Sequence, residues 1–223
     1  MTKDALIVFL RAPDHGRVKT RLAARMGNDV ALGLYLAFLE DLADLARSFV
    51  EKTFVVYDGI EENPPQAFAG MPFFKQRGAD MGEKMANALA DVFKMGFDRS
   101  VLIGSDLPDL PANHLHQALK KLADTPLVLG PATDGGYYLI GCRKETFSRA
   151  LFSDIHWSGP TVLSETLARA YAVGLQTALI DPWPDIDTVE DLKRFYLRNA
   201  QTGRAPHTMQ FLKQQEAEHG LRL

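Results

Sequence analysis

The stretch Ser100-Val101-Leu102-Ile103-Gly104-Ser105-Asp106 is the clearest β-strand signal in this chain of 223 residues. A short apolar run that is bounded by turn residues is typical of a strand inside a sheet. Pro108 lacks the backbone N–H that would continue a ladder of hydrogen bonds, so we expect the strand to stop before it. Asp106 is then expected at the rim of the sheet, which makes the end of this strand as informative as its body.

Similar apolar runs lie on both sides of this strand and alternate with stretches of helical periodicity. Further strands are expected at residues 5–10, 53–58, 73–76, 127–130, 137–141 and 178–180, and helices at residues 29–50, 81–95, 112–122, 160–173 and 188–199. The run 5–10 is continuous, as in a strand that is covered on both faces. The alternation predicts one α/β domain over residues 1–200 with a mainly parallel sheet. Residues 201–223 are polar and are expected to form a helical or partly frayed tail.

The composition excludes several classes of protein. The chain has 25 Lys and Arg against 28 Asp and Glu, for a net charge of -3. It therefore lacks the overall basic field that binds nucleic acids, although a local cluster can still bind a small anion. Cys142 is the only cysteine, which excludes an internal disulfide and fits a cytoplasmic protein best. No apolar run approaches the ~20 residues that are needed to span a membrane.

A cluster of cations follows the first expected strand. Arg11, Arg17, Lys19 and Arg21 fall within eleven positions, and Pro13 and Gly16 in the same loop indicate an unusual backbone path. Such a loop can bind phosphates through side chains and backbone N–H groups, and it can equally be a solvated basic turn that leads into a helix. Neither G-x-G-x-x-G nor a P-loop is present, so the two standard nucleotide-binding motifs are excluded.

Two acidic segments are candidates for a cation site. Asp106 at the rim of the sheet can bind Mg²⁺ or Mn²⁺, or it can cap the turn that follows. Asp185 and Asp187 precede the last helix of the domain, where Asp187 is available as an N-cap. Their spacing of two residues puts both carboxylates on one side of an extended segment, so one of them can share a cation with Asp106.

Two glycine-containing segments are candidates for contact with a ligand. Asp134-Gly135-Gly136 predicts a hairpin turn that also lines a pocket. Gly78 and Gly82 flank the start of the helix at 81–95, where exposed backbone can bind a phosphate or the edge of a nucleobase. A conventional helix start explains this second segment about as well.

Six segments together resemble a bacterial and archaeal family of glycosyltransferase-A-like proteins, usually described as uncharacterised nucleotide-diphospho-sugar transferases. The resemblance covers residues 5–197 and rests on Phe9-Leu10-Arg11-Ala12-Pro13, Gly16-Arg17-Val18-Lys19-Thr20-Arg21-Leu22, Gln76-Arg77-Gly78-Ala79-Asp80-Met81-Gly82, Ile103-Gly104-Ser105-Asp106-Leu107-Pro108, Gly130-Pro131-Ala132-Thr133-Asp134-Gly135-Gly136-Tyr137-Tyr138-Leu139-Ile140-Gly141 and Asp185-Ile186-Asp187-Thr188. The family is related to the guanylyltransferases for molybdenum cofactor and phospholactate. The resemblance implies a three-layer α/β/α sandwich of nucleotide-diphospho-sugar transferase type.

The resemblance also implies roles for individual residues. The metal, Mg²⁺ or Mn²⁺, is expected on Asp106 and on Asp187, which matches the second ligand better than Asp185 does. The nucleotide is expected to contact the basic loop and two further positions, namely Arg11, Ala12, Pro13, Gly16, Lys19, Arg21, Gly82 and Ser105. The chain lacks the Gly-rich loop of the pyrophosphorylases and the close D-x-D of the glycosyltransferases, which leaves the reaction open.

We therefore expect a metal-dependent transferase that acts on a nucleoside triphosphate or a nucleotide sugar. Lys19 is the expected catalytic cation in nucleotidyl transfer, and Asp134 is the expected base in glycosyl transfer to an unknown small-molecule acceptor. A non-catalytic nucleotide-binding or partner-binding module is the alternative. The tail after residue 200 is a candidate contact in a homodimer.

Overall fold

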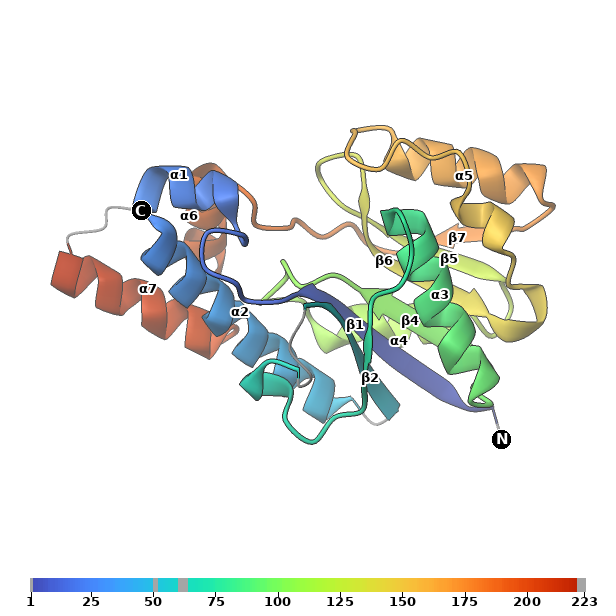
Figure 1. Cartoon of the computed structure of the whole chain (residues 1–223), viewed down its shortest axis with the longest axis horizontal. Helices are drawn as coiled ribbons and strands as arrows, with labels where there is room; N and C mark the ends of the chain where they lie inside the picture. Colours follow the sequence, from blue (N-terminus) through green and yellow to red (C-terminus); the bar gives the residue numbers. More distant parts are fainter. Residues whose placement is uncertain (1, 50–51, 60–63, 220–223) are drawn as a thin grey trace.

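The computed structural model describes residues 2–49, 52–59 and 64–219 (Figure 1). Its centre is a seven-stranded sheet with the order β3-β2-β1-β4-β6-β5-β7. The strands are β1 (Asp4–Arg11), β2 (Lys52–Asp58), β3 (Phe73–Lys75), β4 (Arg99–Ile103), β5 (Leu127–Pro131), β6 (Tyr137–Arg143) and β7 (Thr177–Leu179). Only β6 runs antiparallel to its neighbours β4 and β5 in this sheet. The expected mainly parallel sheet is confirmed.

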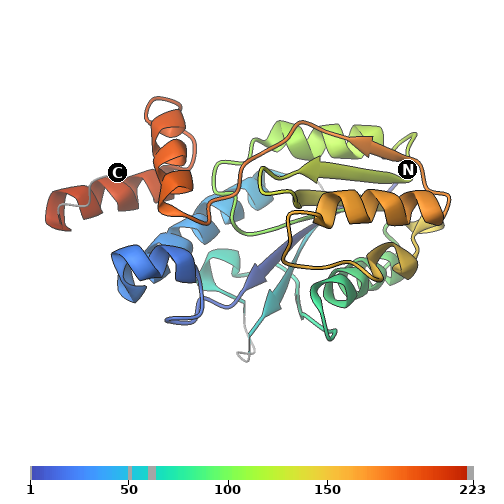
Figure 2. The same ribbon diagram turned by 90° about the horizontal axis from the view of Figure 1, so that it is seen from above.

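Helices cover both faces of this sheet, which Figure 2 shows from above. They are α1 (Thr20–Met26), α2 (Asn28–Ser48), α3 (Met81–Lys94), α4 (Ala112–Lys121), α5 (Val162–Ala172), α6 (Val189–Asn199) and α7 (Pro206–His219). Side chains of β1 alternate between two buried clusters: Leu6, Val8 and Leu10 pack with α2, α4 and α6, whereas Ala5, Ile7 and Phe9 pack with α3 and α5. This alternation explains the continuous apolar run and confirms the three-layer sandwich.

The region before α2 differs from the sequence prediction. A separate helix, α1, precedes α2, and Gly27 with φ 86° separates the two. Lys19 caps the start of α1 in the left-handed conformation, with φ 48° and ψ 43°. The basic loop therefore leads into the short helix α1, and Lys19 lies where the loop ends and the helix begins. The predicted end of the long helix at Val50 lies outside the described residues.

Three predicted boundaries were wrong. The strand β4 ends at Ile103, so Asp106 lies in the following loop rather than on the strand. The cap of α6 is Thr188 and not Asp187, because Thr188 and Asp191 form a reciprocal capping box. Pro160 precedes α5, whose cap is Thr161. The second difference matters for the site, because it leaves the carboxylate of Asp187 available for other contacts.

The tail forms α7, which packs against α2 (Figure 1). Thr208 and Leu212 of α7 are fully buried. The carboxylate of Asp41 in α2 accepts hydrogen bonds from the backbone N–H and the hydroxyl of Thr208, and burial raises the pKa of Asp41. The tail thus covers α2 instead of fraying, although residues 220–223 lie outside the described part. No helix among the described residues is long and apolar enough to cross a membrane.

Candidate functional site

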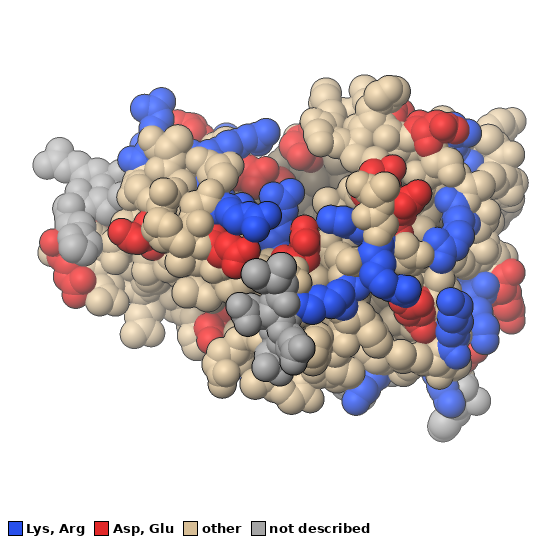
Figure 3. All heavy atoms as spheres, in the orientation of Figure 1, with Lys and Arg blue, Asp and Glu red and all other residues tan. Residues whose placement is uncertain are grey.

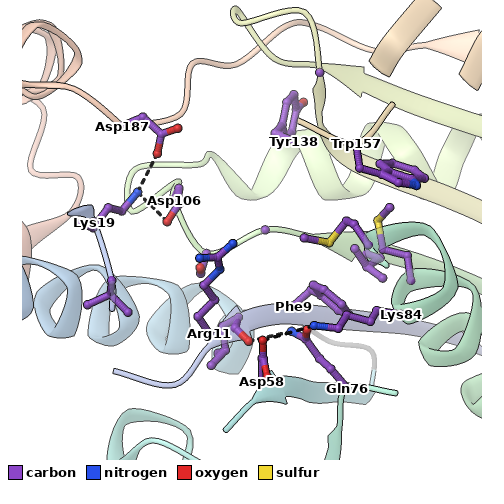
Figure 4. Close-up of a pocket in the computed structure, with 18 of the residues that line it drawn as sticks. Phe9, Arg11, Lys19, Asp58, Gln76, Lys84, Asp106, Tyr138, Trp157 and Asp187 are labelled. Carbon is purple, nitrogen blue, oxygen red and sulfur yellow. Dashed lines mark hydrogen bonds and ion pairs between the residues drawn. The ribbon is translucent and has the colours of Figure 1, made fainter. Parts of the chain in front are cut away.

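A cavity of about 510 Å³ opens at the carboxyl ends of β1 and β4. This is the edge at which open α/β sheets bind their ligands, and the volume suits a small molecule such as a nucleotide. Figure 4 shows that charged side chains line both ends of this cavity and that Arg11 lies between them. Cationic and anionic side chains also lie side by side around a hollow on this face of the molecule (Figure 3).

One end of the cavity holds a cluster that we call the lysine cage: Lys19, Asp106, Asp187 and the carbonyl oxygen of Ile186. The Nζ of Lys19 lies 2.7 Å from Oδ1 of Asp106 and 3.3 Å from Oδ1 of Asp187 (Figure 4). It also donates to the carbonyl oxygen of Ile186 at 2.6 Å. The side chain of Lys19 is only 4% exposed, and Nζ lies 5.4 Å from the ring centroid of Phe38. Oxygen atoms from two distant segments thus enclose one positive charge.

Local structure explains how these segments meet. The backbone N–H of Ile186 donates to the carbonyl oxygen of Asp106 at 3.1 Å, which ties the two acidic segments together. Thr188 caps α6, so the carboxylate of Asp187 is not needed there. Arg21 of α1 lies at the outer side of the cage, with Nη1 3.6 Å from Oδ2 of Asp187 and a side chain that is 74% exposed. The sequence predicted the cations and carboxylates of this cluster but not the direct contact between them.

Tyr35 of α2 lies at the floor of the cavity and was not among the residues predicted from the sequence. Its hydroxyl donates to the carbonyl oxygen of Arg11 at 3.0 Å and lies 3.1 Å from Oγ of Ser105. Burial, with a smaller contribution from the charge of Asp106, raises the pKa of Tyr35. Tyr35 therefore joins the ends of β1 and β4 as a neutral hydrogen-bonding group. Its place in an ordinary apolar helix stripe carried no signal that could have identified it.

The opposite end of the cavity, which we call the far end, is lined by Asp58, Gln76 and Lys84 (Figure 4). The Nζ of Lys84 lies 3.3 Å from Oδ2 of Asp58, and the two side chains are 25% and 55% exposed. The side-chain amide of Gln76 donates to the carbonyl oxygen of Leu10 at 2.9 Å. The apolar side chains beside these groups are Phe9, Met81 and Met85. An apolar surface with a polar edge is the arrangement that suits a planar heterocycle.

Five of the predicted site residues do not line the cavity: Ala12, Pro13, Gly16, Gly82 and Asp134. Ala12 is buried and its N–H donates to the carbonyl oxygen of Asp58. A Cβ on Gly82 would lie 2.6 Å from the carbonyl oxygen of Phe152 and 2.7 Å from the ring of Trp157. Gly82 thus allows close packing and leaves no open backbone for a ligand. Gly16 has φ 73° and serves the path of the loop.

Asp134 lies in the turn between the antiparallel strands β5 and β6, as the hairpin signal predicted. Its carboxylate binds the backbone of its own turn, because Oδ1 accepts a hydrogen bond from the N–H of Gly136 at 2.9 Å. Gly136 lines the cavity whereas Asp134 does not. The turn therefore contributes backbone to the pocket wall, and the carboxylate stabilises the turn.

The wall next to this turn contains a buried pair, Tyr138 and His114. The hydroxyl of Tyr138 lies 2.6 Å from Nδ1 of His114 and donates to the carbonyl oxygen of Asp181 at 2.9 Å. Burial lowers the pKa of His114. The imidazole is thus held neutral and supports Tyr138, which faces the cavity (Figure 4).

The lysine cage has the donor set of a divalent cation site. Carboxylate oxygens are the ligands that Mg²⁺ prefers, and Mg²⁺ is usually bound by one or two carboxylates together with phosphates and water. Asp106 and Asp187 both lie within 3.3 Å of the same positive atom, so one ion can meet both. No group of three or more Asp, Glu, His or Cys side chains suited to a metal occurs among the described residues. The pair therefore fits a metal that arrives with phosphates.

Asp185 differs from Asp187 in its surroundings. Burial raises the pKa of Asp185 to about 6, and the charges of Asp134 and Asp187 contribute. Asp187 contacts both Lys19 and Arg21. Of the two acidic residues, Asp187 is the one that joins the lysine cage.

Comparisons with known proteins agree with the expected family and fold. A protein from Desulfovibrio desulfuricans G20, described as a candidate nucleotide-diphospho-sugar transferase, has a crystal structure that matches with a TM-score of 0.90 and 34% identity over 97% of this chain and 96% of that one. The 2-phospho-L-lactate guanylyltransferase of Methanothermobacter thermautotrophicus is 23% identical over 87% of this chain and 84% of its own length.

A more distant match shows the same fold. The structure of CMP:2-keto-3-deoxy-manno-octonic acid synthetase complexed with CTP matches with a TM-score of 0.58 and 13% identity, over 90% of this chain and 99% of that one. The guanylyltransferase at 23% identity agrees with the expected transferase class. The profile of a family described as an uncharacterized protein conserved in bacteria, DUF2064, matches residues 41–159, which is more than half of the 223 residues. The chain therefore belongs to the DUF2064 family and has the α/β fold of the nucleotide-diphospho-sugar transferases.

Proposed function

We propose that this protein is a metal-dependent nucleotidyltransferase, which transfers a nucleotidyl group from a nucleoside triphosphate to a small acceptor that bears a phosphate. The observation that carries the proposal is the lysine cage, in which Lys19, Asp106 and Asp187 meet at one end of a cavity of about 510 Å³. Two carboxylates and a cation beside one pocket are the groups that a metal-bound triphosphate requires. The relative at 23% identity that is named a 2-phospho-L-lactate guanylyltransferase supports the same class of reaction.

The nucleotide is proposed to span the cavity from end to end. Its phosphates lie at the lysine cage, where Arg11 and Arg21 add positive charge, and its base lies at the far end against Phe9 and Met85. The charged pair of Asp58 and Lys84 at that end offers an acceptor beside a donor, which matches the polar edge of a nucleobase. In this arrangement the charged groups at one end of the cavity bind the phosphates, and those at the other end bind the base.

In the proposed reaction an oxygen of the acceptor phosphate attacks the α-phosphorus. The bond between the α-phosphorus and the oxygen that bridges to the β-phosphate breaks, and this oxygen leaves with pyrophosphate. An ionised phosphate needs no general base, so the protein contributes mainly positioning and positive charge. Asp106 and Asp187 would hold Mg²⁺ or Mn²⁺, which supplies charge neutralisation for the leaving pyrophosphate. Lys19, Arg11 and Arg21 orient the phosphates. Ser105, held by Tyr35, shapes the floor beneath them.

Glycosyl transfer from a nucleotide sugar is the second candidate, because the relative at 34% identity is described as a candidate nucleotide-diphospho-sugar transferase. An inverting enzyme requires a base beside the acceptor, and Asp134 is the predicted base. Its carboxylate is engaged with the N–H of Gly136 and does not line the cavity. This geometry favours nucleotidyl transfer over glycosyl transfer.

A panel of nucleoside triphosphates and nucleotide sugars, each with Mg²⁺ or Mn²⁺ and a set of phosphorylated acceptors, tests the proposal. Release of pyrophosphate supports nucleotidyl transfer, and release of a nucleoside diphosphate supports glycosyl transfer. Binding of nucleotide with no product from any acceptor supports a non-catalytic module and contradicts the proposal. The Asp106→Asn variant is the control for contaminating activity in each assay. Cytoplasmic location and a homodimer remain predictions, which fractionation and light scattering test.

A further inference from the structure

Lys19 cannot act on a phosphate in the position that it has in this structure. An ammonium group has three N–H donors and no acceptor. The carbonyl oxygen of Ile186 at 2.6 Å and the carboxylates of Asp106 at 2.7 Å and Asp187 at 3.3 Å account for all three. Lys19 must therefore leave at least one cage partner before it can contact a nucleotide.

The ammonium of Lys19 also lies between the two carboxylates that would hold a metal. Nζ contacts Oδ1 of Asp106 and Oδ1 of Asp187, so an ion held by these same two oxygens would take the place of Nζ (Figure 4). Two cations so close together would repel each other strongly, since the side chain of Lys19 is only 4% exposed and water screens the interaction poorly. The ammonium and a metal thus compete for the same two carboxylates.

We propose that Lys19 is an internal counterion, which holds the cage closed to metal until nucleotide phosphates draw the ammonium away. This inference rests on the proposed function, because it assigns a regulation to the proposed metal site. The free protein then binds a divalent cation weakly, and the nucleotide and the metal bind cooperatively. Each stabilises the arrangement in which Lys19 has left the carboxylates, so each raises the affinity for the other.

The surroundings of Lys19 support an exchange between two positions. Its Nζ lies over the ring of Phe38, a contact that does not depend on the two carboxylates. Asp106 and Asp187 are 40% and 38% exposed, so water can reach both carboxylates from the cavity side. The lysine is thus buried, whereas the carboxylates that hold it line the cavity and can be reached by a ligand.

Binding of Mn²⁺ to the free protein, followed by electron paramagnetic resonance, tests this inference without any turnover. The Lys19→Met variant keeps the aliphatic stem and removes the charge. We expect it to bind Mn²⁺ at least tenfold more tightly than the wild type when nucleotide is absent. For the wild type, we expect Mn²⁺ to bind more tightly in the presence of a non-hydrolysable nucleoside triphosphate than the affinity of the free nucleotide for Mn²⁺ accounts for. This gain in affinity should be smaller in Lys19→Met.

Arg21→Met is the matched control, since it removes a cation that faces the same Asp187 from an exposed position at 3.6 Å. We expect less than a threefold change in Mn²⁺ affinity for this variant. Adding Asp106→Asn to Lys19→Met should abolish the gain, which ties the bound ion to the cage. Circular dichroism and thermal unfolding confirm that each variant is folded, and Lys19→Gln replaces Lys19→Met if the latter is not.

Equal or weaker Mn²⁺ binding by folded Lys19→Met or Lys19→Gln overturns the inference. The inference is also overturned if the nucleotide-free wild type binds Mn²⁺ as tightly as these variants do. The proposed function fails by a separate result, namely no transfer to any acceptor by the wild type with Mn²⁺, whether or not the nucleotide binds. A variant that gains Mn²⁺ affinity in a protein without transferase activity would leave the counterion role intact and refute only the proposed reaction.

Discussion

The two ends of the cavity carry similar charges in different surroundings. In the lysine cage, an ammonium that is 4% exposed contacts two carboxylates and a carbonyl oxygen. At the far end, Lys84 and Asp58 are 25% and 55% exposed and meet at 3.3 Å. Exposed ion pairs contribute little because water competes for both partners, whereas removing one partner of a buried pair leaves an uncompensated charge. We therefore expect changes in the cage to alter chemistry and changes at the far end to alter nucleotide affinity.

The largest effect is expected from Asp106→Asn in the cage. The substitution preserves size and removes one of the two proposed metal ligands, so activity should fall by about 10²–10³-fold. The thermal unfolding midpoint should change little, because the asparagine oxygen can still accept a hydrogen bond from Lys19 and the carboxylate of Asp187 remains beside it. Steady-state rates for nucleotidyl transfer measure the effect, and circular dichroism monitors the fold. A folded Asp106→Asn protein with full activity would exclude this residue from the metal site.

A large loss of stability is expected from Gly82→Ala, beside the far end. The new Cβ would lie 2.6 Å from the carbonyl oxygen of Phe152 and 2.7 Å from the ring of Trp157. Overpacking of this kind costs about 1–3 kcal/mol, which exceeds the gain from replacing glycine in a helix. Urea denaturation measures the change in the free energy of unfolding.

Gly104→Ala is the control for Gly82→Ala, because a Cβ at residue 104 meets no other atom within 4 Å. We expect the control to leave the free energy of unfolding nearly unchanged. Equal stabilities for the two variants would show that the contacts of Gly82 with Phe152 and Trp157 relax at no cost.

A smaller effect is expected from Lys84→Ala at the far end. Loss of one charged hydrogen bond to the base, at about 1 kcal/mol, should raise the KM for the nucleotide about fivefold. The kcat should stay within about twofold, because this contact is made equally in the ground state and the transition state. Asp58→Asn should behave in the same way. A large fall in kcat with an unchanged KM would place the reacting phosphates at the far end and reverse the proposed orientation.

The smallest effect concerns His114 behind the cavity wall. Burial lowers its pKa below the usual value of 6.5. The unfolded chain then binds more protons at His114 than the folded protein does as the pH falls below about 6.5, so this residue destabilises the fold progressively toward acid. The stability of the wild type relative to His114→Gln should therefore be lower at pH 5.5 than at pH 7.5. Urea unfolding at both pH values measures the difference, and an unchanged difference would contradict a lowered pKa.

The two ends also differ in how far the sequence predicted them. The cage residues follow strands or precede a helix in recognisable motifs, so Lys19, Asp106 and Asp187 were all named as candidates. The sequence predicted the far end only in part: Gln76 belongs to a quoted motif, but neither Asp58 nor Lys84 was predicted as a site residue. A lone Asp at a strand end and a Lys inside a helix occur on many surfaces. The sheet order, which sets β2 beside β1, and the packing of α3 against β1 bring them to one pocket.

The sequence motifs around Asp134 and Gly82 did not predict whether these two residues contact a ligand. The Asp134 turn was correctly predicted as a hairpin, yet the orientation of its carboxylate depends on one hydrogen bond to Gly136 that no motif specifies. Gly82 looked like open backbone at a helix start, whereas Phe152 and Trp157 pack against it. Both outcomes depend on which segments approach these positions, and such contacts are not encoded locally.

The sequence by itself determined the class of fold, because the alternation of apolar runs with helical periodicity reflects how each element buries its surface. It also determined which charged residues lie at the ends of strands and helices, since turn chemistry is local. Only the tertiary structure decided that the ammonium of Lys19 lies between Asp106 and Asp187. These residues lie 87 or more positions away from Lys19 in the chain, and their contact depends on the packing of α1 against α2 and on the link from Ile186 to Asp106.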